Sequence, residues 1–94
     1  MSKLTFQDWT RLDDHSTQVL LRRLDQEQLA VSIEPCDDTL KEQIFRNMSV
    51  RAVKLLREDM AHRAPVAGDE ATAQQLKIEA IMQELQEAGE LVFQ

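Results

Sequence analysis

The stretch DEATAQQLKIEAIMQELQEAG, residues 69–89, decides the fold of this 94-residue chain. Its large apolar side chains recur at the i, i+3, i+4, i+7 spacing of one helix face, at Ile78, Ile81, Met82 and Leu85. This pattern predicts the longest helix of the chain, which begins at Asp69 and closes at Gly89, because glycine readily takes the left-handed conformation that ends a helix. Leu76 and Ala80 lie on a different side, which predicts that the helix is contacted from two directions.

The same helical period occurs in the segment that precedes it, residues 49–63. Its apolar residues form one stripe, at Val50, Val53, Leu56 and Met60. Ser49 is a favourable N-cap, and Pro65 disfavours the helical conformation in the residue before it. A helix that ends near Arg63 is therefore predicted.

Shorter helices are predicted closer to the N-terminus, each opened by a residue that caps helices well. They comprise Phe6–Arg11 after Thr5, residues 14–24 after Asp13, a third that opens at Asp25 and stops before Pro35, and a fourth that begins with the capping box Thr39-Leu40-Lys41-Glu42 and runs to about Asn47. The apolar tail Leu91–Phe93 is predicted to fold back onto the core.

Length and composition agree with an all-α protein. Ninety-four residues suffice for one domain, here residues 1–94, and for one modest core. Two Gly and two Pro leave little material for the turns of a many-stranded sheet or barrel. The expected architecture is a compact stack of five to six short helices joined by short links.

The composition also excludes several classes of function. A formal charge of −6 without a basic patch argues against nucleic-acid binding. The single cysteine, Cys36, and the distant His15 and His62 offer no metal site, and no motif for a cofactor or for catalysis is present. No apolar run is long enough to insert into a membrane, and Met1–Lys3 leads into no signal-peptide core, so a cytoplasmic non-enzyme is expected.

One surface stands out as a candidate binding site, and we call it the charged ridge. On a helical wheel, His15, Gln18, Val19 and Arg22 fall opposite Leu20, Leu21 and Leu24. The acids Asp13 and Asp14 mark one end of this helix, and Arg22 and Arg23 mark the other. Such a ridge can dock a partner of complementary charge. The alternative is a solvated face whose charges cap the helix and match its dipole.

The ridge resembles a stretch in the C-terminal domain family of the bacterial flagellar motor switch protein FliG. The similar residues are Leu12-Asp13-Asp14-His15-Ser16-Thr17-Gln18-Val19-Leu20-Leu21-Arg22. Further blocks follow the family's pattern and spacing, namely Arg46-Asn47-Met48-Ser49, Arg51-Ala52, Leu56-Arg57-Glu58-Asp59, Pro65-Val66, Ala73-Gln74 and Gly89-Glu90 with Val92. The resemblance covers nearly the whole chain.

This resemblance implies an armadillo-like, right-handed superhelical domain on the rotor's cytoplasmic ring, at the inner-membrane face of the flagellar basal body. It implies that residues 14–24 form the torque helix, whose charges meet a cytoplasmic loop of the stator protein MotA. Asp13, Asp14 and Arg22 match the family's acidic pair and distal arginine, and Gln18 matches a polar position on the same face. The other switch-complex proteins are the further partners it implies.

The chain departs from the family pattern at several places. His15 replaces an arginine, Arg23 an acid, and Ala64 a glycine, while the family's Met-Phe-any-Phe hinge appears only as Lys3-Leu4-Thr5-Phe6. These changes leave open a second hypothesis, a stand-alone helical interaction module that has kept the fold and changed its partner. The sequence also leaves open whether the chain is a fragment of a longer rotor protein or a free-standing paralogue.

Overall fold

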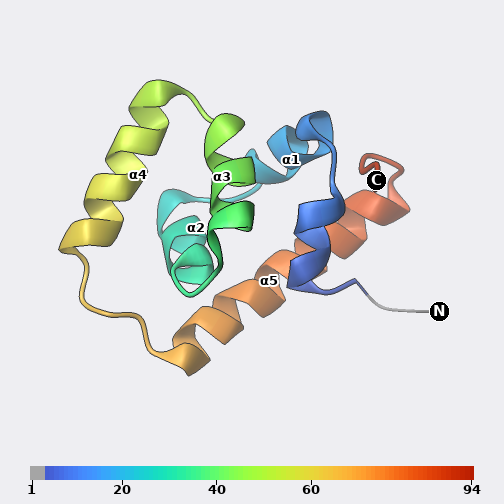
Figure 1. The fold of residues 1–94 in the computed structure, drawn as a ribbon. Helices are drawn as coiled ribbons and strands as arrows, with labels where there is room; N and C mark the ends of the chain where they lie inside the picture. Colours follow the sequence, from blue (N-terminus) through green and yellow to red (C-terminus); the bar gives the residue numbers. More distant parts are fainter. Residues whose placement is uncertain (1–3) are drawn as a thin grey trace.

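The computed structural model describes residues 4–94, and in this range six helices follow one another (Figure 1). They are the 3-10 helix η1 (Phe6–Arg11) and the α-helices α1 (Asp14–Leu21), α2 (Gln26–Ile33), α3 (Asp38–Arg46), α4 (Val50–His62) and α5 (Gly68–Glu87). The predicted all-α stack of five to six short helices is confirmed. Of the stretches discussed above, Met1–Lys3 lies outside the described residues.

Most of the predicted helix starts are confirmed by their hydrogen bonds. Asp13, Asp25 and Ser49 each accept from the backbone N–H three residues on, at 2.8, 2.7 and 3.1 Å. Thr5 precedes η1, and its N–H donates to Asp8 Oδ2 at 2.8 Å. These bonds satisfy N–H groups that have no partner within the helix itself.

Three predicted helix boundaries were wrong. The cap of α3 is Asp37, whose Oδ1 accepts from the Leu40 N–H at 3.1 Å, so Thr39 lies inside the first turn. Helix α1 ends at Leu21, three residues before the predicted end, because the Arg23 and Leu24 N–H groups donate to the carbonyls three residues back and close a tighter turn. Helix α5 begins at Gly68, one residue before the predicted start.

Helix α5 forms the base on which η1, α1 and α2 pack, and α2 lies between α5 and α4 (Figure 1). As predicted, Ile78, Met82 and Leu85 are buried, whereas Ile81 is half-buried. The core cluster consists of Phe6, Trp9, Leu12, Leu20, Leu29, Ala30, Ile33, Leu40, Ile44, Leu56, Ile78, Met82, Leu85 and Leu91. Gly89 has φ +75°, which confirms its predicted role after the last turn.

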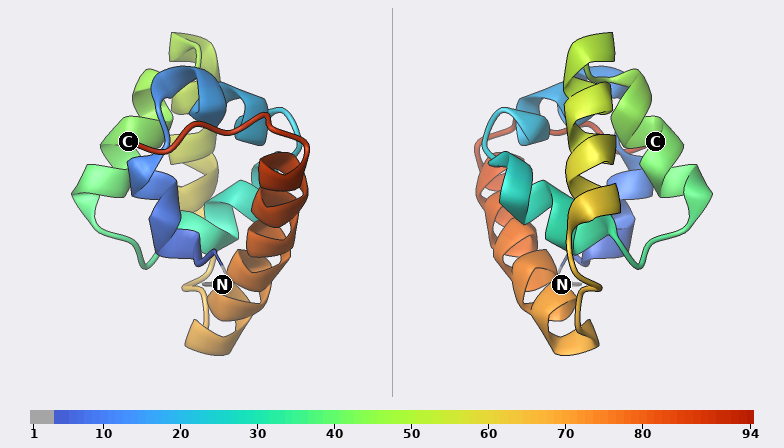
Figure 2. Two further views of the ribbon diagram at one scale, coloured as in Figure 1. Left: turned by 90° about the vertical axis from the view of Figure 1, so that its right-hand side faces the viewer. Right: turned by 90° about the vertical axis from the view of Figure 1, so that its left-hand side faces the viewer.

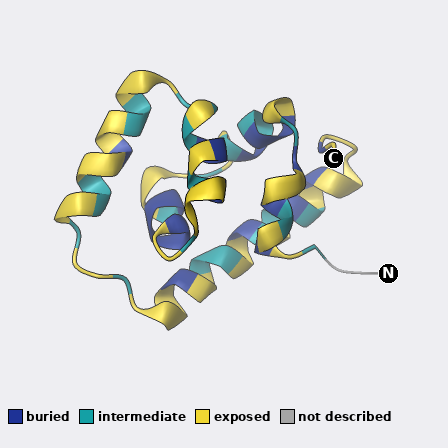
Figure 3. Ribbon diagram, viewed as in Figure 1, coloured by how far each residue is buried: buried dark blue, intermediate teal, exposed yellow. Residues whose placement is uncertain are grey.

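Two predicted apolar faces are less covered than expected. In α4 only Leu56 is buried, while Val50 is 89% exposed, because α4 lies on the outside of α2 (Figure 3). Leu76 is 59% exposed and Ala80 is also exposed, so within residues 4–94 this second side of α5 lacks the predicted contact.

The C-terminal tail returns to the start of α1, as Figure 2 shows. Phe93 pairs with Leu12 in an isolated antiparallel β-bridge, and Leu91 is buried. The Val92 N–H donates to Ser16 Oγ at 2.7 Å, and the Asp13 N–H donates to the Val92 carbonyl at 3.2 Å. The tail therefore fixes the end of α1 that carries the acidic residues. Among residues 4–94, none of the helices is long and apolar enough to cross a bilayer.

Candidate functional site

The charged ridge lies along the outer side of α1. Asp14, Gln18 and Arg22 are spaced four residues apart and follow one line along the helix and its C-cap, beside the exposed His15. Val19 was wrongly placed on this ridge, since it is half-buried and packs against the core. The exposed strip is therefore narrower than the helical wheel predicts.

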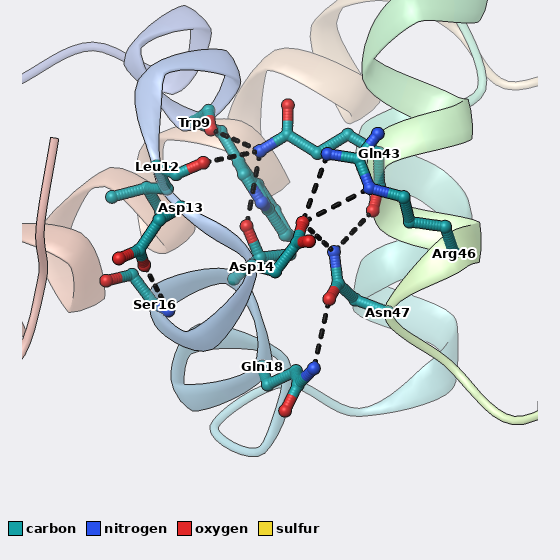
Figure 4. Close-up of polar contacts among 10 residues, drawn as sticks. Trp9, Leu12, Asp13, Asp14, Ser16, Gln18, Gln43, Arg46 and Asn47 are labelled. Carbon is teal, nitrogen blue, oxygen red and sulfur yellow. Dashed lines mark hydrogen bonds and ion pairs between the residues drawn. The ribbon is translucent and has the colours of Figure 1, made fainter. Parts of the chain in front are cut away.

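Asp13, at the N-terminal end of the ridge, is the N-cap of α1. It is half-buried, and its Oδ1 accepts from the Ser16 N–H at 2.8 Å (Figure 4). Hydrogen bonding from the Ser16 side chain and then from the Ser16 backbone lowers the pKa of Asp13 below its ordinary value. This carboxylate is occupied as a helix cap.

Asp14 is exposed but is held by two residues of the α3 end. Its Oδ1 accepts from Arg46 Nη2 at 3.0 Å, from Arg46 Nε at 3.2 Å and from Asn47 Nδ2 at 3.1 Å (Figure 4). The Asn47 hydrogen bond, followed by that of Arg46, lowers the pKa of Asp14. The negative end of the ridge is therefore an ion pair that includes Arg46.

Asn47 connects two positions of the ridge. Its Oδ1 accepts from Gln18 Nε2 at 3.0 Å, while its Nδ2 donates to Asp14 and to the Gln43 carbonyl, the latter at 2.8 Å. The C-terminal end of α3 thus fixes side chains one turn apart on α1. Because Asp14 and Gln18 are both held by Asn47, the spacing between these two ridge positions is fixed.

Gln43 joins the same two helices from inside the protein. The Nε2 of this buried side chain lies 3.0 Å from the Trp9 carbonyl, 3.1 Å from the Leu12 carbonyl and 3.2 Å from Thr17 Oγ1, and these three acceptors share its two N–H hydrogens. It therefore holds η1, the start of α1 and α3 together. Buried polar groups need such partners, because an unpaired one costs about 1–3 kcal/mol.

The positive end of the ridge consists of Arg22 alone. Arg22 is exposed and forms no ion pair within residues 4–94. It borders a shallow notch of 280 Å³ between α1 and the α3–α4 turn, whose lining includes Leu21, Met48 and Ala52. Arg23 instead points towards α5, where its Nη2 lies 3.2 Å from Glu84 Oε2. Of the sequence-predicted ridge residues, Arg23 is thus separated from the others.

Sequence reasoning missed Gln43, Arg46 and Asn47 as partners of the ridge. Arg46 and Asn47 were noted only as part of a family block. The available signal was their spacing, because Gln43, Arg46 and Asn47 follow the i, i+3, i+4 rule on an otherwise polar side of α3.

The pKa of Asp14 tests this network in solution. We expect a carbon-detected NMR titration to give Asp14 a pKa below the ordinary aspartate value, and Asn47→Ala to raise it towards that value. The stabilisation carried by ionised Asp14 is present above the unfolded-state pKa and is lost as the pH falls through the lower folded-state pKa. Asp13 is the internal control, since its lowered pKa depends on Ser16. An unchanged Asp14 pKa in Asn47→Ala would show that the contact is absent.

Neither a cluster of metal ligands nor an activated cysteine is found among residues 4–94. Within residues 4–94, no three or more of the His, Cys, Asp and Glu side chains are grouped as metal ligands. Cys36 is half-buried, and burial raises the pKa of its thiol. The contacts that the ridge residues do form are ion pairs and hydrogen bonds.

Comparison with known proteins identifies the family. The FliG C-terminal domain model matches residues 2–93. The chain is 42% identical to the flagellar motor switch protein FliG of Thermotoga maritima and 39% identical to that of Borreliella burgdorferi, over 88 residues in each case. Each match covers 94% of this chain and 26% of the relative, so the chain spans about a quarter of the curated relatives' length.

Solved structures agree with this assignment. The FliG crystal structure from H. pylori, residues 116–343, superposes with a TM-score of 0.90 at 30% identity, over 94% of this chain and 39% of that one. Full-length FliG from Aquifex aeolicus gives a TM-score of 0.84 at 29% identity, over 87% of this chain and 26% of that one. The chain belongs to the FliG C-terminal domain family.

Proposed function

We propose that this chain is a rotor domain of the flagellar motor switch, which transmits torque through electrostatic contact between its charged ridge and a cytoplasmic loop of a MotA-like stator protein. The role is mechanical and requires neither catalysis nor a cofactor. It places the chain in the cytoplasm, at the inner-membrane face of the basal body, beside the other switch proteins. Family membership and the geometry of α1 support it.

The observation that carries the proposal is the unequal state of the two ends of the ridge. Arg22 is exposed without an ion pair in the described residues, whereas Asp14 is already bound by Arg46 and Asn47. A partner carboxylate therefore finds an available cation at one end. At the other end, a partner cation meets a carboxylate that is held in place. Charges of this kind give steering and register more than affinity.

The attachment of α1 suits the transmission of a lateral force. A force applied to exposed side chains moves the domain only if their helix is fixed to the rest of it. Here Asp14 and Gln18 are tied to α3, Gln43 fixes the start of the helix from inside, and Val92 fixes it from the tail. Exposed ion pairs are worth only about 0–1 kcal/mol each, so such contacts form and break readily.

The alternative, an interaction module with a changed partner, is favoured by His15 and Arg23. His15 is exposed where the family pattern has an arginine, so this position of the ridge lacks the guanidinium group of the family pattern. Arg23 pairs with Glu84 within the chain. His15→Arg separates the two functions: it strengthens binding if the family's stator is the partner, and it leaves stator binding absent if the partner has changed.

The proposal is tested by the binding of this chain to a purified cytoplasmic fragment of a MotA-type stator protein. We expect Arg22→Asp to weaken binding by roughly tenfold, because it turns attraction into repulsion, and we expect raised salt to reduce the difference. Lys77→Asp is the matched control, since Lys77 is an exposed cation on α5, away from the ridge. Equal effects of the two reversals would show that only net charge matters and that the ridge is not the binding surface.

A further inference from the structure

The helices α4 and α5 each carry an exposed apolar surface outside the charged ridge. Val50 at the start of α4 is 89% exposed and Leu76 of α5 is 59% exposed. The helix α2 packs against both α4 and α5 and lies between them (Figure 1). Both surfaces were predicted to be covered, and within residues 4–94 neither is.

The surface on α4 is one wall of a groove that α3 completes. The groove has a volume of 710 Å³, and its apolar lining is Phe45, Met48, Val50 and Val53. Arg57 lies over the Phe45 ring, with its guanidinium carbon 4.9 Å from the ring centroid. The stacked arginine keeps positive charge directly at the edge of the apolar floor.

The charge around this groove is mainly positive. Arg46 and Arg57 line it together with a single acid, Glu42. Arg46 is already paired with Asp14, but Arg51, Lys54 and Arg57 form no ion pair in the part of the chain that is described. Three cations one turn apart on α4 are thus available to a negatively charged partner.

The exposed surface of α5 has the opposite character. Leu76 and Ala80 line a shallow depression of 370 Å³, and the charged residues that line it are all acids, Glu79, Glu84 and Glu87. Glu79 accepts from the Phe6 N–H at 2.8 Å, and Glu84 pairs with Arg23. Glu87 lies only near Gln83, whose Nε2 is 3.4 Å from Glu87 Oε1. A leucine flanked by acids therefore faces outward on a regular helix.

We propose that the α5 surface of one copy of this chain docks into the α3–α4 groove of a second copy. Leu76 is of a size and chemistry that suit the apolar floor around Val50, and the acids of α5 oppose the free cations of α4. The two surfaces differ, so the contact is head-to-tail and leaves a free groove and a free α5 surface at the two ends of every assembly. Small interfaces of this kind are weak and transient.

A second copy is the occupant that the charges favour. The chain carries a net charge of −6, so two copies repel one another unless a local patch of opposite sign is engaged. The α3–α4 groove is such a patch, and the α5 surface is the acidic, apolar helix that fits it. The lining of the groove includes neither Arg22 nor His15. It does include Arg46, which holds Asp14, so the contact adjoins the negative end of the charged ridge.

Sedimentation velocity of the 94-residue chain tests this inference. At low salt we expect the weight-average sedimentation coefficient to rise with concentration up to about 1 mM, and the rise to diminish as salt is added. Val50→Asp and Leu76→Asp each place a charge in one surface, and each alone is expected to raise the dissociation constant roughly tenfold or more. Both positions are exposed, so circular dichroism should show that the fold is kept.

A mixture of the two variants distinguishes the head-to-tail contact from any symmetric one. Val50→Asp retains its α5 surface and Leu76→Asp retains its groove, so an equimolar mixture is expected to form a dimer and nothing larger. Leu55→Asp is the matched control, because Leu55 is exposed on α4 but does not line the groove, and it should associate like the parent. A parent that stays monomeric to about 1 mM, a mixture that stays monomeric, or association that strengthens with salt would each overturn the proposal.

Discussion

Leu56→Ala is expected to lower the free energy of unfolding by about 2–5 kcal/mol, because the truncation leaves a cavity in a core that has little room to collapse. Leu56 is fully buried and is the only buried residue of α4. Leu56 belongs to the core cluster, so the lost contacts also weaken the packing of α4 on the core. The total free energy of unfolding of a native protein is only about 5–15 kcal/mol. A loss of this size should therefore be clear in urea or thermal unfolding.

The neighbouring leucine is the matched control. Leu55 is 46% exposed, so Leu55→Ala should change the stability by no more than about 0.5 kcal/mol. Comparable losses at the two positions, or a loss below about 1 kcal/mol at Leu56, would show that the inward face of α4 has been assigned wrongly.

Gln43→Leu is expected to destabilise the chain by about 1–3 kcal/mol although leucine has a similar volume. The substitution removes the donor to the Trp9 and Leu12 carbonyls and to Thr17 Oγ1, and it leaves these acceptors without that partner in the interior. Chemical unfolding measures the loss. An apolar residue at a buried site normally stabilises, so the sign of the effect identifies the hydrogen bonds as its cause.

Gln86→Leu provides the comparison, since Gln86 is exposed on α5 and leucine forms helices as well as glutamine does. Its effect should lie within about 0.5 kcal/mol of zero. If Gln43→Leu were as mild as Gln86→Leu, the junction of η1, α1 and α3 would not depend on the buried amide.

The helices could be predicted from the sequence because their signals are local. Caps at Asp13, Asp25 and Ser49 and the apolar period of α5 act within a few residues, and each was confirmed. Thr39 shows the limit of such signals. Asp37 and Thr39 are both good caps two residues apart, and only the path of the chain after Pro35 decides between them.

The burial of whole faces depends on packing between helices and could not be predicted in the same way. The stripe that includes Val50 and Leu56 is regular along α4, but only Leu56 is buried and the end at Val50 is open. The predicted contact over Leu76 is absent for the same reason. The helical period of a sequence shows that a face is apolar, but it does not show whether another helix covers that face.

In the candidate site, too, local features could be predicted from the sequence and contacts between helices could not. The outward position of Asp14, Gln18 and Arg22 follows from the helical period of one segment. The contacts of Asp14 with Arg46 and Asn47 join residues more than 30 positions apart, and they arise from the packing of α3 beside α1. A single sequence shows that Gln43, Arg46 and Asn47 share one side of α3, but it does not show that Asp14 is the partner of that side.

The claim that the charged ridge meets a stator of complementary charge is tested most directly by reciprocal charge reversal in a working motor. This chain would replace the corresponding domain of a full-length FliG, and swimming and motor torque would be measured in four strains. These combine the parent or Arg22→Asp rotor with a stator loop that carries either its acid or a base at the opposing position. We expect either single reversal to impair motility and the double reversal to restore it, with folding unchanged throughout. Full motility of Arg22→Asp with the unaltered stator, in a graft whose parent swims, would contradict the account.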